Sequence, residues 1–179
     1  MSKAVLISIQ PKWCELIASG RKTIEVRKTK PNIPTPFKCY IYQTKRTWIY
    51  NIYSKIADWQ QKVIGEFVCD GIISHCEMGN ADIAEQQGCI KREDLIRYAC
   101  GKELYGWHIS DLKIYDKPKE LCEFHQPCKN LEEYEGEVYC DCFNCDYGED
   151  SDYGVIACRR TITRPPQSWC YVERLVGEQ

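Results

Sequence analysis

The chain has 179 residues, enough for one full domain and too few for separate cofactor-binding and substrate-binding domains. Hydrophobic residues make up 44% of it and charged residues 28%, a composition that excludes global disorder. The formal net charge is only −2, but residues 1–62 carry twelve basic against three acidic side chains. That basic and aromatic half is either a solvated lysine-rich face or the footprint of a polyanionic partner such as RNA or DNA.

Hydropathy and cysteine content bear on the compartment. No apolar run approaches the ~20 residues that cross a bilayer, so we expect a protein without a signal peptide and without membrane contact. The chain contains 13 cysteines, an odd number. They favour reduced thiols or metal ligation in the cytoplasm over a secreted disulfide framework.

The first expected elements are a strand and a helix. Residues 4–9, AVLISI, form a β-prone run that Pro11 ends. A helix is predicted from Pro11 to Gly20, because proline is favoured in a first helical turn and glycine just after the last one.

A charged strand follows this helix. The sequence TIEVRK alternates with a period of two. It therefore predicts that Thr23, Glu25 and Arg27 share one strand face, while Ile24 and Val26 point to the other face.

The later elements are mostly strands. Aromatic and β-branched content predicts strands at 37–44, 62–74, 104–116 and 168–175, with bends at Gly65 and Gly71, and a helix at 92–101. Residues 45–61 are polar and aromatic, with a helix expected near their end. Because strands and helices do not alternate, this order favours a small mixed barrel over a parallel doubly wound sheet.

The composition changes between Cys122 and Arg160. Residues 129–153 contain nine acidic side chains and one lysine, with little aliphatic material. Such a segment cannot bury enough apolar surface to order itself. We therefore expect it to need a covalent or metal staple.

Six cysteines lie in this segment, and they predict a structural zinc site. Cys142 and Cys145 have the two-residue spacing that presents two thiolates to one zinc ion, and Cys128 and Cys158 flank them. Zinc binding would supply the missing folding free energy. Cys140, Cys122 or His125 could each replace one of these four ligands, and the alternative is a set of unpaired thiols on a disordered loop. The remaining cysteines are expected to pack in apolar elements: Cys14, Cys39, Cys69, Cys76, Cys89, Cys100 and Cys170.

The segment GRKTIEVR carries a recognisable motif. Taken by itself, a Glu25–Arg27 pair could be a structural ion pair. However, Gly20, Lys22, Glu25 and Arg27 match the pattern Gly-x-Lys-x-x-Glu-x-Arg of the ASCH domain family, which is related to the PUA-like fold. The stretches LISIQPKWCELIASG, KVIGEFVCD, YGWHISDLKIYDKPKEL and RPPQSWCYVERL also resemble ASCH proteins commonly found in prophages.

This resemblance implies a fold. The expected class is α+β, a single PUA-like domain over residues 1–179 with an open β-barrel and flanking helices. The cysteine-rich, acidic segment at about 122–160 looks like an insertion that shorter family members lack, and we expect it to be the small zinc-stapled unit.

The resemblance also implies a cleft near the motif that binds RNA, a nucleotide or a modified nucleoside. There Lys22 and Arg27 would hold phosphate or a base edge, and Glu25 would accept from an exocyclic amine. Trp13, Trp48, Trp107 and Trp169 are candidate stacking surfaces, although each is more often a core residue. Candidate polar contacts are Gln167 and Ser168, with Tyr42, His108 and Ser110 as weaker ones.

The alternative function is hydrolysis. Some ASCH relatives deacetylate N4-acetylcytidine and others cleave single-stranded RNA. In the deacetylating relatives a threonine nucleophile occupies the position of Glu25, so an enzyme would have to use Lys22 and Glu25 as acid and base, with Thr23 a remote substitute nucleophile. A third possibility is an adaptor whose acidic insertion docks a basic protein partner.

Overall fold

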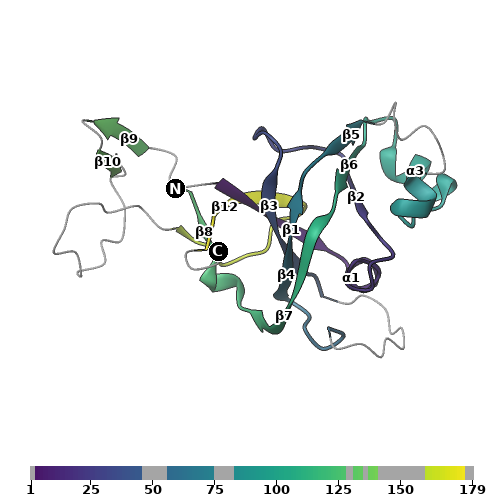
Figure 1. Cartoon of the computed structure of the whole chain (residues 1–179), viewed down its shortest axis with the longest axis horizontal. Coiled ribbons are helices and arrows are strands. Elements are labelled where there is room, and N and C mark those ends of the chain that lie inside the picture. The colour runs from purple at the N-terminus through teal and green to yellow at the C-terminus, as the bar shows by residue number, and fades with distance from the viewer. Residues whose placement is uncertain are drawn as a thin grey trace.

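The computed structural model describes residues 3–45, 56–74, 83–127, 131–134, 137–140 and 160–175. These residues form a mixed α+β fold with many strands and few helices (Figure 1). No helix among them is long and apolar enough to cross a membrane. The proposed zinc ligands Cys128, Cys142, Cys145 and Cys158, and also Trp48, lie outside the described residues.

The larger sheet has the strand order β12-β1-β3-β4-β7. Its strands are β1 (Lys3–Ile9), β3 (Phe37–Gln43), β4 (Lys62–Cys69), β7 (Ser110–Lys119) and β12 (Trp169–Glu173). The neighbours β1 and β3 run parallel, and every other adjacent pair in this sheet is antiparallel. Strand β1 is buried along nearly its whole length, which fits the apolar run at residues 4–7.

The smaller sheet has the order β2-β6-β5, with β2 at Ile24–Arg27, β6 at Tyr105–His108 and β5 at Ile72–Ser74. Each of the stretches expected as one strand, 62–74 and 104–116, divides into two strands that lie in different sheets, so the single strands are wrong. The bend expected at Gly71 is confirmed, because the first division falls there, and a register shift lies at Gly65.

The first corner lies at Asp70 and Gly71, between β4 and β5, and the second lies at Ile109, between β6 and β7. Asp111, whose φ is +46°, lies within β7. A hydrogen bond from the His108 amide to the Gly71 carbonyl, 2.9 Å long, joins the two corners.

The described strands do not close into a barrel. No ladder joins β2 to β12, and side chains cross this opening instead. Trp169 Nε1 donates to Thr29 Oγ1 at 3.0 Å, and the Asn32 amide donates to the Tyr171 hydroxyl at 2.7 Å. The opening between β2 and β12 is called the seam below.

Two predicted helices are confirmed. Helix α1 (Pro11–Ala18) begins at its proline, and Gly20 follows it at φ +71°. Helix α3 (Arg92–Ala99) ends at Cys100 and Gly101, which both have positive φ. Short helical turns also lie at Ile83–Gln87 (η1) and Leu121–Glu123 (η2).

Apolar cores cover both faces of the large sheet. One core lies between the two sheets and α1 and contains Ile7, Ile41 and Trp107. The other core, around Tyr40 and Phe124, lies on the opposite face.

A third cluster places α3 against the outer face of β2. Ile24 and Val26 pack there on Leu95 and Ala99, as the alternation in β2 predicted. Among the cysteines expected to pack, Cys14, Cys39 and Cys69 are buried, whereas the expectation is wrong for Cys100, which follows the last turn of α3 and is exposed.

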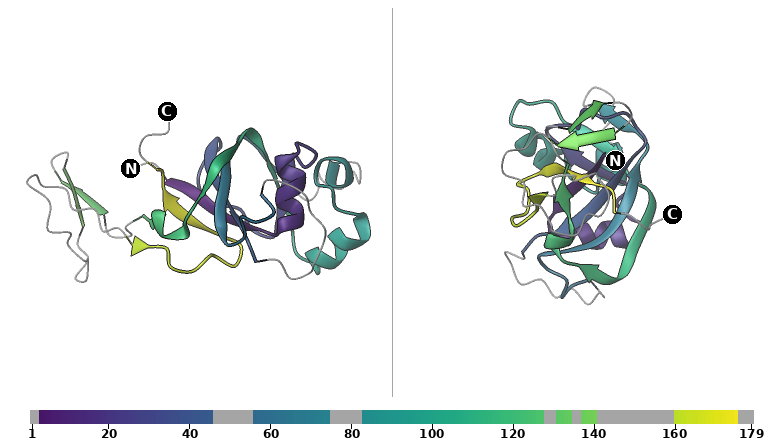
Figure 2. Two further views of the ribbon diagram at one scale, coloured as in Figure 1. Left: turned by 90° about the horizontal axis from the view of Figure 1, so that it is seen from below. Right: turned by 90° about the vertical axis from the view of Figure 1, so that its left-hand side faces the viewer.

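The segment expected as an insertion leaves and rejoins the domain at neighbouring strands. Strand β8 (His125–Gln126) pairs antiparallel with β11 (Arg160–Thr161), so Gln126 lies opposite Arg160. Between them, β9 (Leu131–Tyr134) pairs with β10 (Glu137–Cys140), and this hairpin stands apart from the main body (Figure 2).

Gly65 allows β4 and β7 to approach each other closely. A Cβ atom at this position would lie 2.5 Å from the Lys113 carbonyl oxygen. Because that contact is with backbone, we expect Gly65→Ala to lower the free energy of unfolding by about 1–3 kcal/mol. Urea denaturation checks this, with Gly71→Ala as the matched control, since a Cβ there meets nothing within 4 Å. Equal stabilities of the two variants would contradict the close approach.

Candidate functional site

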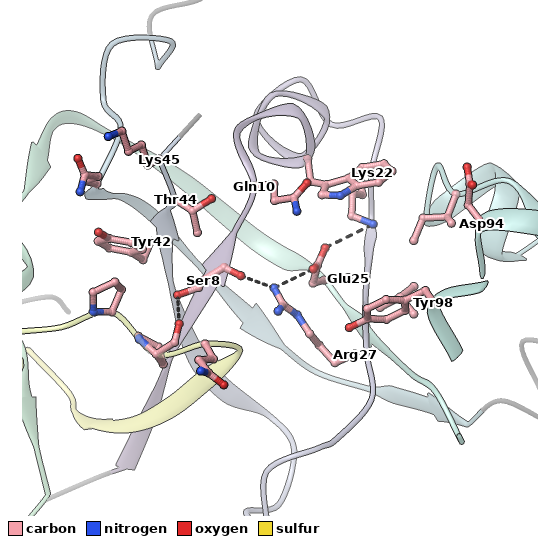
Figure 3. A pocket seen from close by; sticks show the side chains of 17 residues that line it. Ser8, Gln10, Lys22, Glu25, Arg27, Tyr42, Thr44, Lys45, Asp94 and Tyr98 are labelled. Atoms are coloured by element: carbon pink, nitrogen blue, oxygen red, sulfur yellow. Dashed lines mark hydrogen bonds and ion pairs between the residues drawn. The ribbon is translucent and has the colours of Figure 1, made fainter. Parts of the chain in front are cut away.

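A cleft of about 660 Å³ opens where the parallel strands β1 and β3 end. Its walls come from these strand ends, from β2, from α1 and α3, and from the proline-rich residues 165–167. Figure 3 shows the side chains that line it. The volume is in the range of sites that hold small organic ligands.

Three charged side chains of the motif form the centre of this cleft. Glu25 Oε1 lies 2.9 Å from Arg27 Nη2, and Glu25 Oε2 lies 3.4 Å from Lys22 Nζ. All three line the cleft although they are almost fully buried, with exposed fractions of 1% for Lys22, 5% for Glu25 and 8% for Arg27. One carboxylate therefore stands between two cations, and the group carries a net charge of +1.

Burial perturbs the Lys22 amine. Its Nζ donates to the Gly88 carbonyl oxygen at 2.7 Å. Desolvation lowers the pKa of Lys22 below the ordinary value of 10.5, and the nearby charge of Glu25 offsets part of this shift. A lysine of this kind can serve as a base more readily than an exposed one.

Two polar atoms of the group have no hydrogen-bond partner within the described structure. They are Glu25 Oε2, an acceptor whose ion-pair partner Lys22 Nζ lies 3.4 Å away, and Arg27 Nε, a donor. Unsatisfied buried atoms cost free energy and are uncommon in native proteins. In a cleft, such a pair of atoms is what a ligand with both a donor and an acceptor would satisfy.

Arg27 also reaches across the seam. Its Nη2 donates to the Ser8 carbonyl oxygen at 2.6 Å, and its Nη1 lies 3.4 Å from Ser168 Oγ. Ser8 Oγ in turn donates to the Pro166 carbonyl oxygen at 2.6 Å. The strand that carries the motif is thus tied to β1 and to the segment before β12.

Comparisons with known proteins agree with the motif. The family model described as "ASCH domain" matches residues 7–145. The chain belongs to the ASCH domain family. The match covers the motif strand and most of the described fold, and the PUA-like class expected from the sequence is thereby supported.

Solved structures also resemble this ASCH domain. The crystal structure of ASCH from Zymomonas mobilis matches with a TM-score of 0.51 at 19% identity, covering 66% of this chain and 73% of that chain. A serine-to-alanine mutant of the same protein matches with a TM-score of 0.51 at 19% identity, over 66% and 74%. At this identity the likeness concerns the fold alone. The comparison with curated proteins found no match.

Several residues predicted for the site line the ASCH cleft. In addition to the charged group, these are Trp13, Tyr42 and Gln167. The Trp13 ring already has the Lys12 ammonium 4.1 Å and the Lys22 ammonium 5.0 Å from its centre. Burial raises the pKa of the Tyr42 hydroxyl.

Other candidates lie elsewhere in the described structure. Trp107 is fully buried, and Trp169 packs against it with ring centres 5.9 Å apart. His108 Nδ1 contacts Asp70 at 2.6 Å, and Ser110 Oγ donates to the Val68 carbonyl oxygen at 2.9 Å. None of these four is among the residues that line the cleft, which favours packing and corner-forming roles for them.

The cleft also contains residues that the sequence did not single out. Thr44 and Lys45 follow β3, and Asp94 and Tyr98 come from α3. Asp94 and Tyr98 are four residues apart, a spacing that places them on one helix face. This spacing predicts that the two side chains lie together, but only the packing of α3 on β2 brings this helix face to the motif.

We expect Glu25→Gln to disrupt the charged group. Without the carboxylate, two buried cations lose their counterion, so the free energy of unfolding should fall by about 3–5 kcal/mol. The pKa of Lys22 should fall further, because Glu25 raises it. Chemical denaturation and NMR titration of the lysine amine measure these two effects.

The pH dependence has a definite sign. Because the folded-state pKa of Lys22 lies below 10.5, the unfolded chain binds more protons than the folded chain at pH values between the folded-state pKa and 10.5. The contribution of Lys22 to the free energy of unfolding therefore rises with pH in this window.

The control for Glu25→Gln is Glu120→Gln, which changes the exposed Lys62–Glu120 pair. We expect this control to lower the free energy of unfolding by at most about 1 kcal/mol. Equal losses in both variants would contradict the central role of Glu25.

Proposed function

We propose that this ASCH domain binds RNA or a modified nucleoside in the cleft at the Lys22–Glu25–Arg27 group. The observation that carries the proposal is the placement of these buried charges on the wall of a ligand-sized cleft, where Arg27 Nε has no hydrogen-bond partner within the described structure and Glu25 Oε2 has only an ion pair with Lys22. A buried ion pair contributes little to stability for its desolvation cost. Recognition of a ligand would explain why these charges are buried despite that cost.

The chemistry of the group suits a nucleotide. The net charge of +1 attracts phosphate, and the arginine can contact phosphate or a base edge with two nitrogens. The carboxylate accepts from an exocyclic amine such as that of cytosine. The excess of basic residues in the first 62 positions extends the attraction beyond the cleft.

Hydrolysis is the second candidate, and the lowered pKa of Lys22 favours it. A neutral Lys22 amine could take a proton from water as that water attacks an acyl carbon on an exocyclic nitrogen, and then return the proton to the departing amine. For an acetylated cytidine, one water is consumed, and cytidine and acetate are released. Thr23, the substitute nucleophile considered from sequence, is not among the cleft-lining residues of the described structure.

Binding and hydrolysis can be tested with the same variants. We expect Lys22→Met and Arg27→Lys each to weaken binding of a fluorescent single-stranded RNA 10-mer about tenfold or more. Lys22→Met should also reduce the salt slope of log K by about 0.7, since it removes one phosphate contact. Fluorescence anisotropy at several salt concentrations measures both quantities, and circular dichroism verifies folding.

The matched control for Lys22→Met is Lys117→Ala, which removes an exposed lysine on β7. Binding that ignores salt, or that falls equally in the control, would contradict the proposal. Incubation with N4-acetylcytidine distinguishes the two candidate functions, because release of cytidine that is lost in Lys22→Met would replace simple binding with hydrolysis.

We also propose a structural zinc ion held by Cys128, Cys142, Cys145 and Cys158. The β8–β11 pairing supports this, because Gln126 faces Arg160 and the outer two cysteines each lie two residues beyond that pair in sequence. Cys140 ends β10, two residues before Cys142.

The seven cysteines whose side chains are described are free thiols, which supports a reducing, cytoplasmic location.

Elemental analysis tests the metal proposal. We expect about one zinc per chain, because four thiolates complete a tetrahedral site. Cys145→Ser should lose the metal, whereas Cys122→Ser, an exposed cysteine outside the four, should retain it. A well-folded protein that purifies without zinc would exclude the site.

A further inference from the structure

The cleft continues on both sides of its charged centre. In Figure 3, Tyr42, Thr44 and Lys45 lie on one side of the Lys22–Glu25–Arg27 group, and Tyr98 and Asp94 lie on the other. A base that contacts Glu25 would therefore leave the cleft walls on both sides of it unoccupied. A free nucleoside would fill only the centre.

An exposed aromatic ring stands at the α3 end of the cleft. Tyr98 lines the cleft and is 39% exposed, a high fraction for a large hydrophobic side chain. The Lys28 ammonium lies 4.8 Å from the centre of its ring. Tyr98 and Lys28 thus combine a stacking surface with a cation, the pairing that proteins use for single-stranded nucleic acids.

The positive charge continues along the chain from Arg27. Lys28, Thr29 and Lys30 are all exposed directly after β2. The Lys30 ammonium lies 5.3 Å from the ring centre of Tyr105, the residue opposite Arg27 in the β2–β6 ladder. Two lysine–tyrosine pairs therefore follow one another beside the edge strand that carries the motif.

Acidic groups in this region are partly compensated. Asp94 at the same end of the cleft has Arg97 Nη1 3.2 Å from its Oδ1. Glu103 accepts a hydrogen bond from the Tyr105 hydroxyl at 2.7 Å. The Tyr98 side chain remains partly open to solvent.

We infer that the cleft holds one nucleotide of a single-stranded nucleic acid, and that the next nucleotide stacks on Tyr98 with its phosphate near Lys28 and Lys30. This inference rests on the proposed function and specifies it, since it assigns the site to a polymer. Tyr98 is then a binding residue outside the motif. The chemistry named, a base followed by a phosphodiester, is shared by RNA and single-stranded DNA.

The experiment compares probes of increasing length. Binding of cytidine 5′-monophosphate and of oligocytidylates of three, six and ten nucleotides, as RNA and as DNA, is measured for each variant by calorimetry or anisotropy. We expect affinity to rise with length in the wild type. Tyr98→Ala should weaken 10-mer binding by about five- to a hundredfold and by a larger factor than it weakens mononucleotide binding, while Tyr98→Phe should bind like the wild type.

The lysines are tested by charge and by position. Lys28→Ala with Lys30→Ala should reduce the salt slope for the 10-mer by about 1.4, the value for two phosphates on a single strand. The matched control, Lys113→Ala with Lys117→Ala, removes two exposed lysines from β7. For Tyr98 the control is Ile96→Ala, which truncates a side chain on the same helix that is 64% exposed.

The outcomes separate this inference from the function on which it rests. If the mononucleotide binds and needs Lys22 and Arg27, but longer probes bind no more tightly, the proposed function holds and the stacking surface is excluded. If neither the mononucleotide nor any oligonucleotide binds, the proposed function itself fails. A 10-mer affinity that is unchanged in Tyr98→Ala likewise overturns the inference, and a difference between the RNA and DNA arms identifies the natural polymer.

Discussion

The structure depends on one carboxylate held between two cations. Glu25 contacts Lys22 on one side and Arg27 on the other, and all three are almost fully buried. Burial of any one of these charges without the other two would cost several kcal/mol, because a buried charge without a partner loses its hydration and gains nothing in exchange. The spacing of the motif follows from this requirement: Glu25 and Arg27 alternate onto one face of β2, and Lys22 precedes the strand by two residues.

The same group links the site to the architecture. The chain passes between the two sheets at the corners near Gly71 and Ile109, but among the described strands no ladder joins β2 to β12. Arg27 reaches Ser168 Oγ, just before β12, across this seam and also donates to the Ser8 carbonyl oxygen of β1. The residue that contacts the carboxylate thus also holds the motif strand against the large sheet, so binding and folding draw on one set of hydrogen bonds.

The parts of the fold that follow local rules could be predicted from the sequence. Pro11 and Gly20 bound α1, and the alternation in β2 separates Glu25 and Arg27 from the apolar residues beneath α3. The bend at Gly71 could be predicted from the glycine, but the assignment of the halves of 62–74 and 104–116 to different sheets could not, because it depends on hydrogen bonds between segments that are distant in sequence. The α3 wall of the cleft was missed for a similar reason, since only tertiary packing brings Tyr98 to the motif.

The pairing of β8 with β11 has a consequence for the acidic segment between them. Because Gln126 and Arg160 are directly opposed, the chain leaves and re-enters the domain at two points that are one strand spacing apart, about 5 Å. A tight two-residue turn would bridge the same gap. The pairing of β8 with β11 therefore allows the segment between them to change in length without a change in the positions of these two strands.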